Sequence, residues 1–470
     1  MLKNFITAQL KESEMDPSIF KAYDIRGVYP DQITEEDAWK IGWAAARFLR
    51  SLLRGYERGQ ASSQAICVAR DMRKHSLSLC KALVDGMRAT GTNVIDIGMI
   101  DTPQMYFAIN HIGTCGGVQV TASHNPAKYN GFKVSGLQAK PVGIDTGLKD
   151  IEHIAMALPH TKGKVTGTVE QRDLTEEYKN HVLKFLRPNI RRLKIAVDAS
   201  NGMAGKMVPA ILSNVPIDII PLNFEHTGIF KHEPNPLIEE NLSELKASVR
   251  KNKCDFGICF DGDADRLIMV DEKADTISCD LLTALMAPYF LKTNPKSTVV
   301  YDLRSSLVVS EEILKYGGIP RRERVGHAFM KKALRDSHGV FGGELSGHFY
   351  YRDNYWTDSG LITLVHVLNI ISDAKVPVSE LIKPLRRYFN SGETNFKVDD
   401  KQTKMDELAK RYADAQIDHL DGITIRYKDW WFNCRPSNTE PLLRLNIEAK
   451  TKELLDEKFA ELSKMLGKPV

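Results

Sequence analysis

Short apolar runs alternate with helically spaced segments three times along the chain. In the first repeat, Leu79, Leu83 and Met87 lie on one face of an expected helix, and a second apolar run follows it. Strand–helix–strand units of this kind are typical of parallel β-sheets. The repeats begin with the apolar runs at residues 65–69, 193–197 and 298–301.

The C-terminal part of the chain has a different pattern. Apolar runs follow one another closely at residues 423–427, 430–433 and 442–449, and a helical pattern closes the chain at 452–466. We therefore expect an α/β protein: three similar α/β domains with mixed or parallel sheets, followed by an α+β domain. The expected domains are residues 1–170, 171–275, 276–390 and 391–470.

The composition excludes several classes of protein. The chain has 64 basic and 60 acidic residues, and this near balance predicts no nucleic-acid partner. The longest apolar stretch, Leu361–Ile371, is too short to cross a bilayer, and the N-terminus lacks a continuous apolar segment. We therefore expect a cytoplasmic protein with no membrane partner. The seven cysteines form no C-x-x-C pair and are expected to be buried thiols.

The first segment with candidate chemistry is Thr121–Pro126, which follows a short apolar run. The dipeptide Asn125-Pro126 stops a helix and fixes an extended or turn conformation. Ser123 is therefore held on a rigid loop at the end of a strand, where a nucleophile can be presented. Taken alone, the same residues are also ordinary turn formers.

The second segment, Asp261–Arg266, follows a strand of buried character and places three aspartates at alternate positions. Such carboxylates can converge on one hard cation, and without a cation they would repel one another. An EF-hand is excluded because Arg266 stands at its sixth position, where glycine is required. The segment predicts a metal site formed by Asp261, Asp263 and Asp265.

Two further segments can bind a phosphorylated sugar. In Gly342–His348, Glu344 and Ser346 are two residues apart, so in an extended loop both point the same way and can hold vicinal hydroxyls. The segment Arg435–Pro441 offers a guanidinium, hydroxyls and backbone N–H groups, which suit a phosphate that is not transferred. A glycine-rich turn and a proline-bounded hairpin turn are the respective alternatives.

Together these segments resemble the α-D-phosphohexomutase superfamily, most closely its phosphomannomutase/phosphoglucomutase branch. The motifs T-A-S-H-N-P, D-G-D-A-D-R, G-G-E-L-S-G-H and R-P-S-N-T-E-P occur in the family's order. Residues 21–27 also look like its N-terminal motif, so the similarity extends from about Ser18 to the C-terminus. Ala264 stands where many members carry glycine; since its side chain points away from the aspartates, we expect no loss of metal binding.

The resemblance implies a mechanism in which Ser123 is phosphorylated in the resting enzyme. Ser123 gives its phosphoryl group to a hexose monophosphate and forms a 1,6-bisphosphate. This intermediate turns over inside a cleft between all four domains and returns its other phosphate to Ser123. The enzyme would interconvert the 1- and 6-phosphates of mannose and/or glucose. Its cofactor would be Mg²⁺, its activator a hexose 1,6-bisphosphate, and its state a monomer or weak dimer.

The roles of individual residues follow from the same resemblance. Lys133 and His327 would lie near the reacting oxygen as proton-transfer groups. The catalytic set would be Ser123, Lys133, His327, Arg266 and Arg26, and Mg²⁺ would be held by Ser123, Asp261, Asp263 and Asp265. The substrate-binding set would be Tyr23, Glu344, Ser346, His348, Arg435, Ser437, Asn438 and Thr439.

Three alternative interpretations remain at this point. A strand followed by D-x-D also resembles aspartyl-phosphate phosphatases, in which Asp261 would be the nucleophile. A non-catalytic sensor of sugar phosphates would have the same binding loops. A phosphoglucosamine mutase would share the family, although such enzymes typically have glutamine where Leu345 stands.

Overall fold

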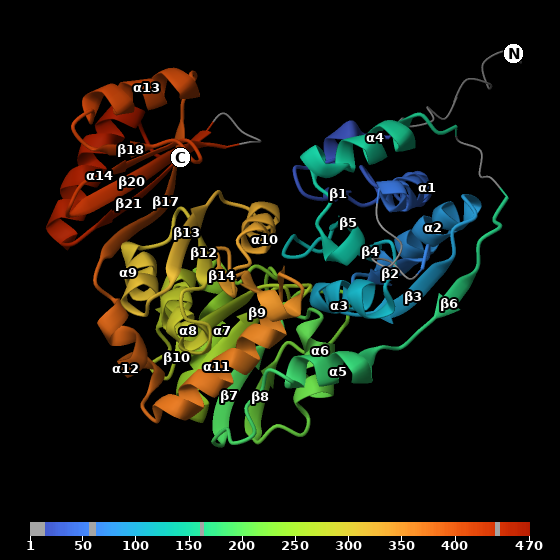
Figure 1. Cartoon of the computed structure of the whole chain (residues 1–470), viewed down its shortest axis with the longest axis horizontal. Coiled ribbons are helices and arrows are strands. Elements are labelled where there is room, and N and C mark those ends of the chain that lie inside the picture. Colours follow the sequence, from blue (N-terminus) through green and yellow to red (C-terminus); the bar gives the residue numbers. More distant parts are fainter. Residues whose placement is uncertain (1–14, 56–62, 160–163, 438–441) are drawn as a thin grey trace, which may run out of the picture. The chain divides into compact units, whose positions relative to one another are not determined.

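The computed structural model describes residues 15–55, 63–159, 164–437 and 442–470 (Figure 1). The chain forms two compact units. One contains the residues up to Leu174 together with Glu225–Glu233, and the other contains Thr175–Phe224 and Pro234–Val470.

The first unit is built on a mixed sheet with the strand order β1-β5-β4-β2-β3-β6. The pairs β2/β3, β2/β4 and β3/β6 are parallel, whereas β4/β5 and β1/β5 are antiparallel. Its strands are β1 (Ile25–Val28), β2 (Ile66–Arg70), β3 (Val94–Met99), β4 (Gly117–Val120), β5 (Tyr129–Ser135) and β6 (Val169–Gln171), and its α-helices are α1 (Glu35–Ser51), α2 (Ser76–Ala89), α3 (Thr102–Ile112) and α4 (Leu148–Met156).

Helices α1 and α2 pack backbone to backbone through glycine. A Cβ atom on Gly42 would lie 2.1 Å from the Leu83 carbonyl oxygen, and one on Gly86 would lie 1.9 Å from that of Trp39. Only glycine fits at these two positions, so the glycines fix the α1–α2 packing that covers this part of the sheet.

The second unit begins with a sheet of order β11-β10-β9-β7-β8, in which β7, β8 and β9 are parallel. All five residues of β9 are buried, as expected for a central strand covered on both faces. The elements of this part are α5 (Thr175–Leu183), β7 (Leu193–Asp198), α6 (Ala204–Leu212), β8 (Ile217–Leu222), α7 (Ser243–Asn252), β9 (Phe256–Phe260), β10 (Leu267–Asp271) and β11 (Thr276–Ile277).

The next sheet has the order β13-β12-β14-β15-β16, with β12 parallel to both β13 and β14. Its elements are α8 (Cys279–Thr293), β12 (Thr298–Asp302), α9 (Leu307–Lys315), β13 (Ile319–Glu323), α10 (His327–Asp336), β14 (Phe341–Gly343), β15 (Phe349–Tyr351), β16 (Thr357–Asp358), α11 (Gly360–Ala374) and α12 (Val378–Ile382).

The C-terminal sheet is antiparallel throughout, with the order β17-β21-β20-β19-β18. Helix α14 packs on β17 and β21, and α13 packs on β19 and β20 (Figure 1). The elements are β17 (Phe389–Lys397), α13 (Lys401–Arg411), β18 (Gln416–Asp418), β19 (Ile423–Arg426), β20 (Trp430–Pro436), β21 (Leu442–Ala449) and α14 (Lys452–Leu466).

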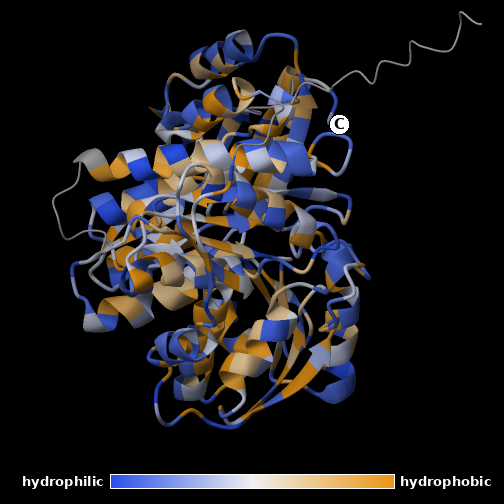
Figure 2. Cartoon of the chain, turned by 90° about the vertical axis from the view of Figure 1, so that its right-hand side faces the viewer, coloured by the Kyte–Doolittle hydropathy of each residue, from blue (hydrophilic) through white to orange (hydrophobic). Residues whose placement is uncertain are grey.

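This architecture confirms the predicted fold class of three α/β domains with mixed sheets and a C-terminal α+β domain. Figure 2 shows hydrophobic residues along the strands and on the helices, where they form the cores. One local prediction is wrong: Arg435 and Pro436 are not loop residues, because β20 continues through them and pairs with β21. The three boundaries between the four expected domains stay predictions.

All seven cysteines are unpaired and buried, as expected. Burial raises the pKa of the Cys67 thiol to about 11 and that of Cys434 to about 12, so both remain protonated at neutral pH. Within the described residues, no single helix is long and apolar enough to cross a membrane; α11 followed by Val378–Leu385 passes by length and composition only as a pair bent by 92°.

Candidate active site

The serine loop of the first unit joins β4 to β5. Ser123 is 3% exposed, and its backbone N–H donates to the Thr121 hydroxyl at 2.9 Å. Its φ of 48° lies in the left-handed region, which costs an L-residue roughly 1–2 kcal/mol. The Ser123 hydroxyl lies 3.3 Å from Nδ1 of His124. The loop therefore holds its serine in one constrained conformation.

Two basic residues predicted to be catalytic lie on the strands next to this loop. Arg26, on β1, donates to the Asn125 side chain and forms an ion pair with Asp24. Arg26 lies opposite Gly131 on β5, and Lys133 is two residues further along, so both point to the same face of the sheet. Tyr23 lies half-buried just before β1.

The carboxylate triad lies in the second unit, in the connection from β9 to β10. Asp261, Asp263 and Asp265 are all buried, and their ligand oxygens lie within 4.8 Å of one another. Arg266 closes the turn, since its N–H donates to Asp261 at 3.2 Å and its Nε lies 3.7 Å from the same carboxylate. Three oxygen donors of this kind fit a hard cation such as Mg²⁺ better than a zinc ion, which prefers nitrogen and sulfur.

Neighbouring segments fix the triad loop from two sides. The Met203 N–H donates to the Gly262 carbonyl at 2.9 Å, and a Cβ on Gly202 would lie 2.6 Å from that oxygen. The Gly360 N–H, at the start of α11, donates to the Ala264 carbonyl at 3.2 Å. The three carboxylates are therefore preorganised by backbone contacts.

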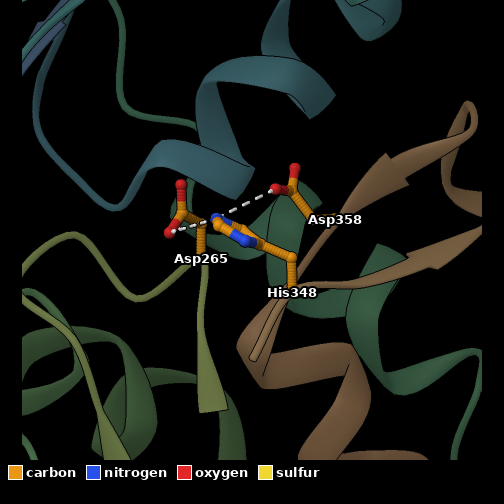
Figure 3. A group of neighbouring side chains, drawn as sticks. All are labelled: Asp265, His348 and Asp358. Carbon is orange, nitrogen blue, oxygen red and sulfur yellow. Dashed lines mark ion pairs between the residues drawn. The ribbon is translucent and has the colours of Figure 1, made fainter. Parts of the chain in front are cut away.

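A second cluster of possible ligands shares Asp265 with the triad (Figure 3). His348 Nε2 lies 3.4 Å from Asp265 and 3.8 Å from Asp358. However, the ammonium of Lys331 lies 2.8 Å from Asp358, and both side chains are 1% exposed. Because this cation already offsets the charge of Asp358, we interpret the cluster as an ion-pair network and the triad as the candidate metal site.

The predicted hydroxyl grip converges on His348. The Ser346 hydroxyl lies 2.8 Å from His348 Nδ1, and a Glu344 oxygen lies 3.8 Å from the same nitrogen. The phenol of Tyr350 donates to Glu344 at 2.8 Å. Burial, reinforced by the charge of Glu344, raises the pKa of Tyr350, so its hydroxyl stays a donor. A carboxylate, a hydroxyl and an imidazole thus lie next to one another.

An ion pair that the sequence analysis missed supports this loop. Asp302, at the end of β12, accepts from Arg304 Nη2 at 2.8 Å and from the Leu345 N–H at 2.7 Å. Burial would raise the pKa of Asp302, but the charge and hydrogen bonds of Arg304 outweigh burial and lower it. Arg304 also lies 3.7 Å from Glu344. The signal was available, since Asp302 directly follows an apolar strand run, as Asp261 does.

Glu393 connects this network to the predicted phosphate clamp. It forms ion pairs with Arg435, which is 4% exposed, and with Arg444 at 3.3 Å, and it lies 3.9 Å from Arg304. The positive groups of two domains are thus gathered around one carboxylate. Such a cationic group can also hold a phosphate dianion.

The remaining predicted residues are less closely connected. His327 begins α10, and its ring centroid lies 6.0 Å from that of His348. Ser437 follows β20 and is buried, with its N–H donating to the Leu442 carbonyl at 2.8 Å. Asn438 and Thr439 lie outside the described residues.

Each of these groups suits phosphoryl-transfer chemistry: a carboxylate triad that fits a hard cation, a cationic cluster that fits phosphate, and a constrained serine. The comparisons with known proteins specify the class further. Models of the phosphoglucomutase/phosphomannomutase family match all four domains: α/β/α domain I at residues 17–159, domain II at 176–274, domain III at 278–388 and the C-terminal domain at 393–465. The chain belongs to this family and is a phosphohexomutase, an isomerase.

Similar proteins extend over nearly the whole chain. A phosphomannomutase of Vibrio cholerae is 36% identical over 461 residues, covering 96% of this chain and 98% of its own. A Xanthomonas campestris protein with the name phosphohexose mutases is 37% identical over 453 residues, which cover 95% of this chain and 98% of that protein. The solved structure of a phosphoglucomutase/phosphomannomutase family protein of Burkholderia thailandensis has a TM-score of 0.87 at 31% identity, covering 96% and 97%.

Proposed function

We propose that this enzyme interconverts the 1- and 6-phosphates of mannose and glucose through a phosphoserine at Ser123 and a bound hexose 1,6-bisphosphate. The observation that carries the proposal is the buried triad of Asp261, Asp263 and Asp265, whose oxygens lie within 4.8 Å of one another. Bound there, Mg²⁺ would neutralise charge on the transferred phosphoryl group.

In the proposed reaction, a sugar hydroxyl attacks the phosphorus of phosphoserine 123, and the bond from phosphorus to Ser123 Oγ breaks. The hydroxyl gives up its proton, and Ser123 Oγ regains one when its phosphate has left. Lys133 and His327 remain proton-transfer candidates from the sequence. The geometry adds His348, whose ring nitrogens lie 2.8 Å from Ser346 and 3.4 Å from Asp265.

Glu344 and Ser346 are proposed to hold the sugar hydroxyls at carbons three and four, and Arg435 the phosphate that is not transferred. Glucose and mannose differ only at carbon two, so this grip cannot separate them. Leu345 offers no hydrogen bond to an amino group at carbon two, and glucosamine phosphate should therefore be the poorer substrate.

The test combines phosphate mapping with rates on three sugars. Freshly purified protein should carry phosphate on the peptide that contains Ser123, and Ser123→Ala should lose nearly all turnover. Phosphate confined to Asp261 would instead identify the phosphatase mechanism. Mannose 1-phosphate and glucose 1-phosphate should both turn over when primed with bisphosphate; a highest kcat/KM for glucosamine 6-phosphate would reassign the enzyme to that branch.

A further inference from the structure

Arg73, which follows β2, is a buried arginine whose guanidinium faces the backbone of the serine loop. It is 3% exposed. Its Nη2 donates to the carbonyl oxygens of Ser123 at 2.9 Å and Asn125 at 2.6 Å. Its Nη1 donates to those of Pro126 at 2.8 Å and Tyr129 at 3.0 Å. One side chain thus binds both ends of the loop.

Asp71 fixes the orientation of this guanidinium. It accepts from Arg73 Nε at 3.1 Å, and both side chains are 1% exposed. Asp71 also accepts from the Arg73 N–H at 3.0 Å and from the Ser76 hydroxyl. The ring of Phe230 lies 5.0 Å from the guanidinium carbon. Because a planar guanidinium presents its donors in a fixed fork, this arrangement determines where the four carbonyls lie.

The loop depends on such support. Ser123 has a φ of 48°, a conformation that persists in an L-residue only where the surroundings impose it. Residues 126–128 of the loop also line an open cavity of about 540 Å³ with His75 and Phe230. Side-chain packing is therefore incomplete along this part of the loop. The His75 ring adds one contact there, 3.0 Å from the Ala127 carbonyl.

We propose that Arg73 is a positioning residue for Ser123. It acts through the loop backbone, without contacting substrate, and keeps the serine hydroxyl in place as it accepts and releases a phosphoryl group. This inference rests on the phosphoserine mechanism proposed above. A lysine at position 73 keeps the positive charge, but its single ammonium group cannot donate to all four carbonyl oxygens. Lysine should therefore not restore the function of Arg73.

The test follows transfer of ³²P from labelled glucose 1,6-bisphosphate to full-length dephosphorylated protein. Arg73→Lys should slow labelling of Ser123 by about 100-fold, since a misplacement of roughly 1 Å costs that much. The KM for the sugar phosphate should stay within about twofold. Hydrogen exchange should accelerate at the backbone amides of residues 123–129 and not elsewhere in the first unit.

Arg88→Lys is the matched control. Arg88 lies on α2 in the same unit, donates to the Gly167 carbonyl at 2.9 Å and pairs with Asp85, so it makes similar contacts away from the loop. The Arg88→Lys variant should be labelled on Ser123 as fast as the wild type. Asp71→Asn, which is isosteric, should cause a smaller decrease in the same rate and provides the readout if Arg73→Lys does not fold.

The outcomes separate the two proposals. If wild-type protein takes up no label on Ser123, the phosphoserine mechanism fails. If the wild type is labelled and both Arg73→Lys and Asp71→Asn are labelled equally fast, Arg73 does not position Ser123. A rise in KM without a slower labelling rate would likewise overturn the inference.

Discussion

Replacing Lys331 by methionine removes the ammonium group that lies 2.8 Å from the Asp358 carboxylate. The shape of the side chain stays nearly unchanged. At this distance the attraction is about 6 kcal/mol for an effective dielectric constant of ~20. Part of it offsets the cost of burying both charges, so removing one partner should destabilise the protein by about 3–5 kcal/mol. For a unit of this size, the melting temperature should fall by roughly 6–10 °C.

A double-mutant cycle measures this coupling in thermal unfolding experiments. Lys331→Met/Asp358→Asn should be more stable than Lys331→Met alone, because the double variant leaves no unpaired buried charge. The control is Lys332→Met, since Lys332 is the next residue of α10 but its side chain is 73% exposed. That substitution should change stability by less than about 0.5 kcal/mol.

The same variants decide between the two possible metal clusters. If Asp265, His348 and Asp358 form an ion-pair network, wild-type protein should bind one equivalent of Mn²⁺ in a titration, and Lys331→Met should not add a second. The contrary result is a Lys331→Met variant that is as stable as the wild type and binds a second equivalent of Mn²⁺. It would refute our assignment of the metal site to the triad alone.

Two further substitutions test the candidate site, and a third tests Glu448, a buried carboxylate of β21. Asp263→Asn should lower turnover by about 10²–10³-fold with little loss of stability, and EDTA should abolish wild-type activity. Arg435→Ala should raise KM about tenfold or more, because a hydrogen bond to a charged group contributes roughly 1.5–3 kcal/mol. Glu448→Gln should raise the melting temperature at pH 8, since Leu307 N–H at 2.9 Å and Trp431 Nε1 at 2.8 Å can still donate to its side-chain oxygen. This gain should disappear in acid, because burial raises the pKa of Glu448 above that of an exposed glutamate, and the wild type loses stability only as pH rises through that raised pKa.

Each of these predictions has a distinct contrary result. Full activity after chelation would exclude a metal from the reaction, and equal KM values for Arg435→Ala and wild type would remove that residue from the binding site. A pH-independent difference between Glu448→Gln and wild type would show that the charge of Glu448 does not limit stability.

The elements that could be predicted from the sequence are those with a strong apolar period. The predicted helix at 452–466 and strand at 442–449 agree with α14 and β21 to the residue. By contrast, β17 begins at Phe389, although the sequence pattern predicts a strand only over residues 395–398. The reason is that most of its side chains are exposed or half-exposed, so its first half carries no apolar run.

The candidate site shows the same division. Asp261, Glu344 and Arg435 stand in local motifs and could be selected from sequence. Lys331 could not, because a lysine in an amphipathic helix normally marks the solvent face, and its partner is 27 residues away. Glu393 could not either, since its role depends on arginines brought together from three separate segments. Ion pairs between distant segments leave no periodic signal.

The position of Glu393 affects how the proposed phosphate clamp would bind phosphate. Arg435 is nearly buried and already paired with a carboxylate, and Arg304 pairs with Asp302 and lies near Glu344. A bound phosphate must therefore compete with Glu393 or displace it, and part of the electrostatic gain replaces an existing ion pair. Phosphate should therefore bind more weakly here than to an arginine without a carboxylate partner. In return, the ion pairs with Glu393 keep Arg435 and Arg444 oriented when no substrate is bound. This favours an enzyme that must hold each sugar phosphate firmly enough to orient it and still release the product.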